Sequence, residues 1–131
     1  MSMKSMPSPR LAIDLDKVGS PVDSNSTRCD FMVVAHDILN NICYFLPVEL
    51  KGESWKASQV VRQLQASSSD AERLISEEDQ IRFIPVLTQK STHPMERQKL
   101  RESSNRIRFH RHEEPVQIRR CGDQLSRVLV K

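Results

Sequence analysis

The chain has 131 residues, of which 37% are hydrophobic, 28% are charged and only 5% are aromatic. This length is typical of one domain, and its core must be built mainly from Val, Ile and Leu. No apolar run approaches the roughly 18 residues that a transmembrane helix needs. With only three glycines, the sequence contains none of the glycine-rich phosphate loops of nucleotide-binding proteins.

The cysteines and the N-terminus both bear on the compartment. Cys29, Cys43 and Cys121 are an odd number without close spacing, which favours reduced thiols over a disulfide framework. The first residues contain no apolar stretch of signal-peptide length. We therefore expect a cytoplasmic protein with no membrane partner.

The net charge of +3 is distributed unevenly along the chain. Residues 1–96 have 10 Lys and Arg against 13 Asp and Glu, a balance of −3, whereas residues 97–131 have 10 against 4, a balance of +6. A basic C-terminal quarter is an electrostatic footprint for a polyanion such as nucleic acid. A solvated surface without a ligand is the alternative.

The N-terminal part has little regular patterning. Residues 1–27 are rich in Ser and Asp and contain three prolines, so we expect a flexible or weakly structured segment with one short helical turn at Leu11–Val18. Residues 28–131 are expected to form a single α/β domain.

Two apolar segments joined by a short polar link follow this segment. The patterning predicts strands over Cys29–Ala35 and Ile42–Lys51, the second ending before Gly52. Because Asp37–Asn41 supplies only a short turn, the two strands are expected to form an antiparallel hairpin. Pro47 has no N–H to donate, so we expect it at a bulge or on an unpaired side of its strand.

Helical and extended patterns then alternate. Apolar spacing predicts a helix that begins near Trp55 and that Ser67–Asp70 interrupts. A third strand is expected over Ile81–Leu87, parallel to the hairpin strand because a helix connects them. A second helix over His93–Ser104 precedes a half-buried strand over Arg106–His112, in which apolar and basic residues alternate.

The last elements complete a mixed architecture. Val116–Arg119 is expected as one more short strand, and Gln124–Val130 as a closing segment. The order β-hairpin, α, β, α, β predicts an α/β domain with a small mixed β-sheet and flanking helices.

Three ionisable residues lie at the ends of the hairpin strands. Asp30 opens the first strand, and Glu49 and Lys51 lie two apart on the second, so these two share a face. Two carboxylates beside one another suit Mg²⁺ or Mn²⁺, and a lysine alongside stabilises developing negative charge. These groups are the ones that metal-assisted phosphodiester hydrolysis needs. An ordinary Glu–Lys pair on a surface strand is the alternative.

Asp30, an interval of 18 residues, and then Glu49-Leu50-Lys51 resemble the signature of the PD-(D/E)XK, or restriction-endonuclease-like, nuclease superfamily. Cys29-Asp30 takes the place of the family's Pro-Asp pair. The resemblance covers about residues 28–112 and implies a restriction-endonuclease-like core and a metal-dependent nuclease of DNA or RNA. It further implies that Asp30, Glu49 and the backbone carbonyl of Leu50 hold the metal and that Lys51 is the catalytic lysine.

A glutamine on the following helix often lies near the site in this superfamily. Gln63 is the best positional match, and Gln59, one turn earlier, is the alternative. Trp55 either stacks on a base or anchors the start of the helix. Phosphate contacts are expected from basic residues of the C-terminal quarter, namely Lys99, Arg101, Arg106, Arg108 and Arg111.

Other interpretations compete with the nuclease. His110 and His112 lie two apart, a spacing that can chelate Zn²⁺, although no third ligand accompanies them. Cys29 and Cys43 are expected as core filling rather than as nucleophiles. The upstream glutamate of many superfamily members has no clear counterpart here, which favours a catalytically inert interaction or nucleic-acid-binding module. With either function, so short a chain favours a homodimer or a subunit of a larger complex.

Overall fold

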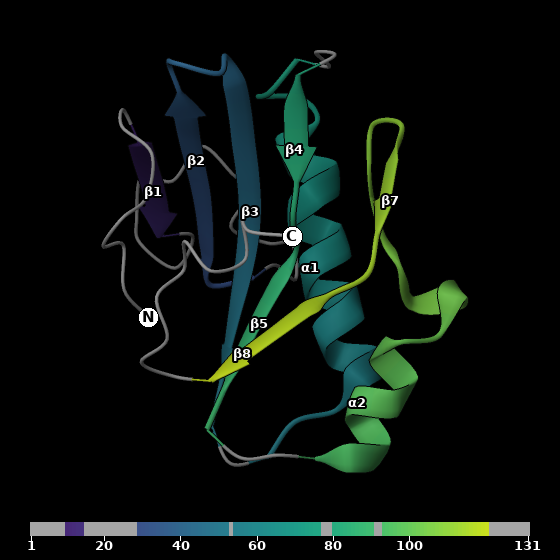
Figure 1. Cartoon of the computed structure of the whole chain (residues 1–131). Coiled ribbons are helices and arrows are strands. Elements are labelled where there is room, and N and C mark those ends of the chain that lie inside the picture. The colour runs from purple at the N-terminus through teal and green to yellow at the C-terminus, as the bar shows by residue number, and fades with distance from the viewer. Residues whose placement is uncertain (1–9, 15–28, 53, 77–79, 91–92, 121–131) are drawn as a thin grey trace.

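The computed structural model describes residues 10–14, 29–52, 54–76, 80–90 and 93–120. Within these residues the chain forms a mixed six-stranded sheet, a separate two-stranded sheet and two α-helices (Figure 1). The large sheet has the strand order β1-β2-β3-β5-β8, with β4 also paired to β3. The predicted class, a small α/β domain with a mixed sheet and flanking helices, is confirmed at this level.

The predicted hairpin is present. Strands β2 (Phe31–Asp37) and β3 (Ile42–Lys51) pair in antiparallel register, with Phe31 opposite Val48. The turn is built as its sequence predicts: Asp37 Oδ1 accepts the backbone N–H groups of Leu39 and Asn40 at 3.1 and 3.3 Å.

Strand β1 (Arg10–Asp14) pairs antiparallel with the outer edge of β2. It lies within the segment expected to be weakly structured, and a strand replaces the helical turn expected to begin at Leu11. The backbone of β2 offers an open row of hydrogen-bonding groups on this side, and pairing with that row selects an extended conformation that local propensity did not indicate.

The third predicted strand is interrupted. β4 (Ile81–Phe83) and β5 (Val86–Gln89) both run parallel to β3, as expected, but Pro85 separates them. Pro47 faces this same step. The Ile84 N–H donates to the carbonyl of Phe45 at 2.9 Å, so odd-numbered residues of β3 direct their backbone groups to this side. The missing N–H of Pro47 therefore falls where no strand pairs, which confirms the prediction for Pro47.

The first helix, α1 (Ala57–Ala71), continues through the serine run that was expected to interrupt it. Ser67 and Ser68 are fully buried, and the Ser68 hydroxyl donates to the carbonyl of Leu64 at 2.8 Å. The predicted interruption is therefore wrong, because back-bonding and tertiary contacts satisfy hydroxyls that would otherwise compete with the helix.

The basic C-terminal part forms short elements. Helix α2 (Pro94–Leu100) and a 3₁₀ turn (Ser103–Asn105) replace the single helix expected over His93–Ser104. The strand expected over Arg106–His112 is instead a hairpin of β6 (Ile107–Phe109) and β7 (His112–Glu114), which forms the separate two-stranded sheet.

The main sheet ends at β8 (Gln117–Arg120), which is parallel to β5 and close to the predicted last strand. His110 explains the preceding hairpin: its φ of 51° reverses the chain in the middle of the alternating pattern. The expected closing segment at Gln124–Val130 lies outside the described residues.

Two apolar layers cover the sheet faces. One contains Phe45, Leu87 and Leu64 of α1, and the other contains Val33, Leu46 and Val86. Helix α1 thus covers the sheet face that also presents the odd-numbered side chains of β3. Among the described residues no helix is long and apolar enough to cross a membrane.

Candidate active site

The sheet register brings the acidic ends of the hairpin together. Because Phe31 faces Val48, the next pair outward is Asp30 and Glu49. The backbone N–H of Leu50 donates to Asp30 Oδ2 at 2.8 Å, although the two residues are 20 positions apart. The carboxylate of Asp30 is therefore fixed against the middle residue of Glu49-Leu50-Lys51, as the sequence predicted.

Glu49 is a buried carboxylate, with only 2% of its surface exposed. Its Oε1 lies 3.9 Å from Lys51 Nζ, and the Lys51 side chain is 15% exposed. Both side chains point to the face that α1 covers, because Phe45 of the same strand packs against Leu64 there. An ion pair this far from water is uncommon for a merely solvated Glu–Lys pair, so the surface-strand alternative does not describe this geometry.

The segment that carries Asp30 is tied to α1 through Cys29. The backbone N–H of Cys29 donates to the Ser67 hydroxyl at 2.6 Å, and its thiol donates to the carbonyl of Phe31 at 3.1 Å. Burial raises the pKa of the Cys29 thiol from 9.0 to about 12, and the negative charges of Glu49 and Asp30 raise it further toward that value. Cys29 therefore lies beside both carboxylates as a neutral, buried group, in agreement with its expected packing role.

This environment predicts a pH-dependent reactivity. The folded-state pKa of Cys29 is raised, so the stabilisation from keeping the thiol neutral is complete below about pH 9 and falls as the pH rises toward 12. At pH 8 we expect iodoacetamide to leave Cys29 unmodified in the native protein and to alkylate it in 6 M urea, because the thiolate is the nucleophile. Peptide mass mapping measures this, with the less buried Cys43 as the internal reference.

Gln63, rather than Gln59, is placed as the predicted helix glutamine requires. Gln63 lies one turn before Ser67, on the side of α1 that contacts Cys29. Its Oε1 is buried and accepts no hydrogen bond from a described residue, whereas Gln59 is exposed. A buried carbonyl oxygen of this kind calls for a water or ligand donor.

Trp55 anchors the segment between β3 and α1. Its indole N–H donates to Gln89 Oε1 at 3.0 Å, and its ring makes an edge contact with His93 at a centroid distance of 5.5 Å. Because Trp55 is only 4% exposed, the anchoring interpretation fits better than stacking on a base. Sequence patterning did not identify Gln89, since a single glutamine at the end of an apolar strand carries no signal before the register is known.

The predicted phosphate contacts divide between two places. Lys99 and Arg101 belong to the α2 region, which touches the start of α1 where Glu96 Oε1 accepts the Ala57 N–H at 3.3 Å. This is the lower end of the molecule in Figure 1, where β3 and β5 also end. Arg106, Arg108 and Arg111 instead belong to the β6–β7 hairpin and the segments next to it, beyond α1 from the sheet.

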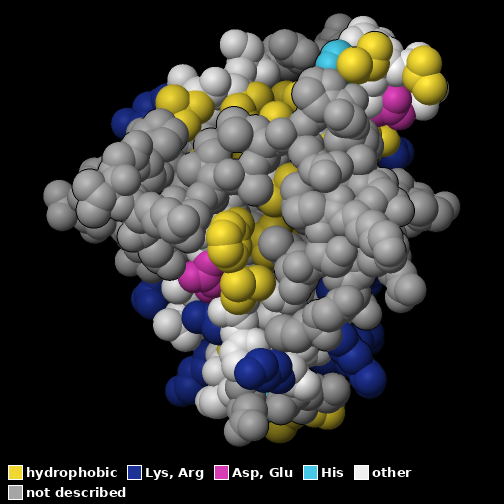
Figure 2. All heavy atoms as spheres, turned by 90° about the vertical axis from the view of Figure 1, so that its left-hand side faces the viewer, with side chains coloured by type: hydrophobic (Ala, Val, Ile, Leu, Met, Phe, Trp, Pro, Cys, Tyr) yellow, Lys and Arg dark blue, Asp and Glu magenta, His cyan; other side chains and the backbone are white. Residues whose placement is uncertain are grey.

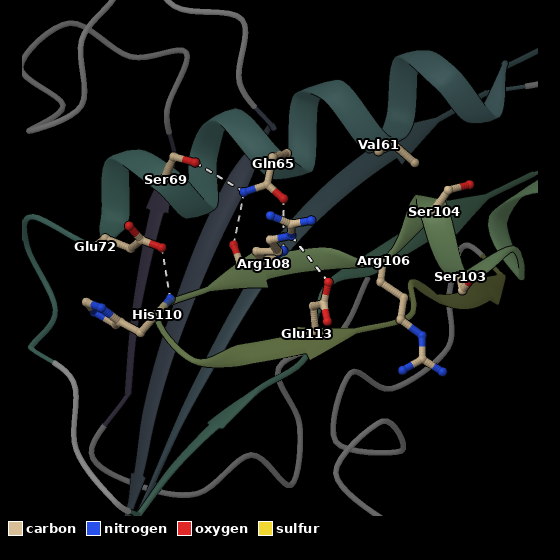
Figure 3. Close-up of a pocket in the computed structure, with 10 residues that line it drawn as sticks. All are labelled: Val61, Gln65, Ser69, Glu72, Ser103, Ser104, Arg106, Arg108, His110 and Glu113. Atoms are coloured by element: carbon tan, nitrogen blue, oxygen red, sulfur yellow. Dashed lines mark hydrogen bonds and ion pairs between the residues drawn. The ribbon is translucent and has the colours of Figure 1, made fainter.

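A groove of about 550 Å³ separates α1 from this hairpin (Figure 3). The Gln65 amide bonds both backbone groups of Arg108, at 2.8 and 3.0 Å, and Glu72 Oε1 accepts the His110 N–H at 2.8 Å. The Arg108 guanidinium pairs with Glu113 at 3.3 Å, and Figure 3 shows Arg106 extending away from the helix. The groove is thus a seam where the hairpin docks on α1, with acidic and basic groups in balance.

The histidine pair does not form the face that a zinc site would need. His110 lies in the turn and His112 begins the next strand, so they are not alternate residues of one strand. The His110 ring also contacts the carbonyl of Ile75 through Nε2 at 2.7 Å. Among the described residues, no three His, Cys, Asp or Glu side chains are grouped so as to hold a metal ion.

Comparison with known proteins adds no relative. Neither a protein-family model, nor a curated protein, nor a solved structure matches this chain.

Proposed function

We propose that this protein is a metal-dependent nuclease of the restriction-endonuclease-like type, which hydrolyses phosphodiester bonds of DNA or RNA. The hydrogen bond from the Leu50 N–H to Asp30 Oδ2 at 2.8 Å carries the proposal. It joins an acidic residue at the start of one strand to an acidic-apolar-basic triplet at the end of its partner, on the face that α1 covers. The order β-hairpin, α, β, α, β around this point supports the same interpretation.

The oxygen donors at this point fit Mg²⁺ or Mn²⁺. Asp30 and Glu49 supply carboxylate oxygens, and Leu50 adds a backbone carbonyl. In an extended strand the N–H and C=O of one residue point in the same direction, so the Leu50 carbonyl is directed toward the side from which Asp30 contacts the Leu50 N–H. This donor set has only two acidic side chains, which agrees with the lack of a three-residue cluster among the described residues. When bound, the ion supplies Lewis-acid stabilisation of phosphoryl charge.

The other residues have complementary tasks. Lys51, held 3.9 Å from Glu49, directs an ammonium group to the site and stabilises the negative charge that grows on the phosphorane oxygens. Gln63 offers its buried Oε1 as an acceptor that orients the attacking water. Neither task requires movement of the strands.

Positive charge surrounds this end of the molecule. Exposed lysines stand just after the strand ends, Lys56 at the start of α1 and Lys90 after β5, and Lys99 and Arg101 are exposed near α2. Figure 2, which faces the β1 edge, shows most of the Lys and Arg side chains in view gathered toward this lower end. We expect this rim, more than the β6–β7 hairpin, to contact the phosphates that flank the cut.

The direct test is cleavage of labelled DNA and RNA oligomers with Mg²⁺ or Mn²⁺. We expect cutting that EDTA abolishes and that Asp30→Asn reduces by at least about 100-fold. This variant keeps an amide oxygen for the Leu50 N–H and removes the negative charge, so its melting temperature should stay close to that of the parent chain. Isothermal titration with Mn²⁺ should show one binding event in the parent that is lost in the variant.

A catalytically inert module is the second candidate. It is favoured by the contacts that both carboxylates already make within the chain, Asp30 with a backbone N–H and Glu49 with Lys51. If the parent protein neither cuts nor binds Mn²⁺ through Asp30, these contacts are structural and the nuclease proposal is wrong.

A further inference from the structure

Lys51 has a buried glutamine beside it on the next strand. In the parallel register of β3 and β5, Lys51 is the partner of Gln89 and Glu49 is the partner of Leu87. Paired residues of parallel strands project from the same face of the sheet, so Gln89 stands on the α1 side, next to Lys51. Gln89 is only 4% exposed, which is unusual for an amide side chain at the end of a strand.

Trp55 fixes which way this amide is turned. The indole N–H has donor capacity only, so the group that faces it at 3.0 Å is the amide oxygen of Gln89. Trp55 is itself held by the edge contact with His93 and by burial. The two N–H donors of Gln89 are consequently directed away from the indole, and none of them bonds a described residue.

We propose that the amide N–H groups of Gln89 donate to a non-bridging oxygen of the phosphodiester bound at Lys51, and that Trp55 is a positioning residue that holds the amide in this orientation. The inference rests on the proposed nuclease function and assigns to β5 a contact with the substrate. A neutral amide suits this place because it adds hydrogen-bond donors without competing with the phosphate for the metal, as a third carboxylate would. Ligands commonly bind at the carboxyl ends of parallel strands, where Gln89 lies.

Two substitutions separate the donors of Gln89 from its packing. Gln89→Glu retains an oxygen acceptor for the Trp55 indole but replaces both N–H donors by negative charge. Gln89→Met retains the length of the side chain and removes every hydrogen bond. We expect either variant to lower kcat/KM for a labelled oligonucleotide by about 10- to 100-fold, the loss expected for a hydrogen bond to a charged group. Binding of the same oligonucleotide in EDTA, followed by fluorescence anisotropy, should weaken in parallel.

A double-mutant cycle tests the role of Trp55. Trp55→Phe should lower kcat/KM by about 3- to 10-fold in the parent, since the amide is then free to turn, and should have no further effect in the Gln89→Met background. A purely structural role would lower kcat/KM in both backgrounds alike. Melting temperatures of the variants show whether each one folds.

The outcomes distinguish the two proposals. If the parent cuts with Mg²⁺ and Gln89→Met cuts with the same kcat/KM, Gln89 does not touch the phosphate and only the present inference is overturned. If the Trp55→Phe and Gln89→Met effects simply multiply, Trp55 does not act through Gln89. If the parent does not cut at all, the nuclease function falls and this inference falls with it.

Discussion

Glu49→Gln should abolish cleavage while leaving the protein folded. We expect the rate of oligonucleotide hydrolysis with Mg²⁺ to drop by about 10³-fold or more, because the substitution removes one of the two carboxylates that hold the metal. Mn²⁺ titration by calorimetry should show the loss of the same binding event that Asp30→Asn removes. A variant that still cuts at the parent's rate would exclude Glu49 from the site.

Stability separates this effect from unfolding. Gln has the volume of Glu, and a buried carboxylate carries a desolvation cost that its ion pair offsets only in part. We therefore expect the free energy of unfolding to change by no more than about 1 kcal/mol, in either direction. Loss of activity together with loss of fold would mean that Glu49 is needed for folding, and the nuclease proposal would lose its support from this variant.

Glu113→Gln is the matched control. Glu113 also pairs with a basic residue, Arg108 at 3.3 Å, but it is 55% exposed and lies on the β6–β7 hairpin. An exposed ion pair contributes little to stability, and this hairpin lies beyond α1 from the candidate site. Both activity and melting temperature should therefore match the parent, which shows that the Glu49 effect is not a general result of removing an acidic charge.

The hairpin and its acidic ends were predictable because local signals agreed. Alternating and apolar runs, a short turn with Asp37 and Asn41, and the single proline in β3 all pointed to one register. Once the register is set, Asp30 must face Glu49. Residues that depend only on this pairing were therefore placed correctly from the sequence.

Features that depend on tertiary contacts were not predictable in this way. The serine run ends a helix by propensity, yet Ser67 is buried against Cys29 and the helix continues. The alternating pattern of Arg106–His112 is equally suited to one long strand and to two short ones, and the positive φ of His110 decides between them. Gln89 became visible only through the parallel pairing of β3 with β5, since strands so far apart in sequence leave no periodic mark of their partnership.

Phe45→Ala should be the most destabilising substitution in the core. Phe45 is fully buried at the centre of β3, and its ring lies 4.7 Å from that of Phe109 and 5.8 Å from that of Phe83. Removing a buried ring of this kind costs about 3–5 kcal/mol, a large part of the roughly 5–15 kcal/mol that stabilises a domain. We expect a correspondingly large fall in the urea midpoint, followed by the fluorescence of Trp55, the only tryptophan.

The ring cluster also connects separate parts of the chain, which makes the effect diagnostic. Phe109 belongs to β6 and Phe83 to β4, so Phe45 links the main sheet to the small hairpin. Leu39→Ala, at a turn position that is 95% exposed, is the control and should change stability by less than about 0.5 kcal/mol. If Phe45→Ala and Leu39→Ala unfolded at the same urea concentration, the hairpin would not be packed on the sheet through these rings. The separation of the arginines of the hairpin from the candidate site would then have no structural basis.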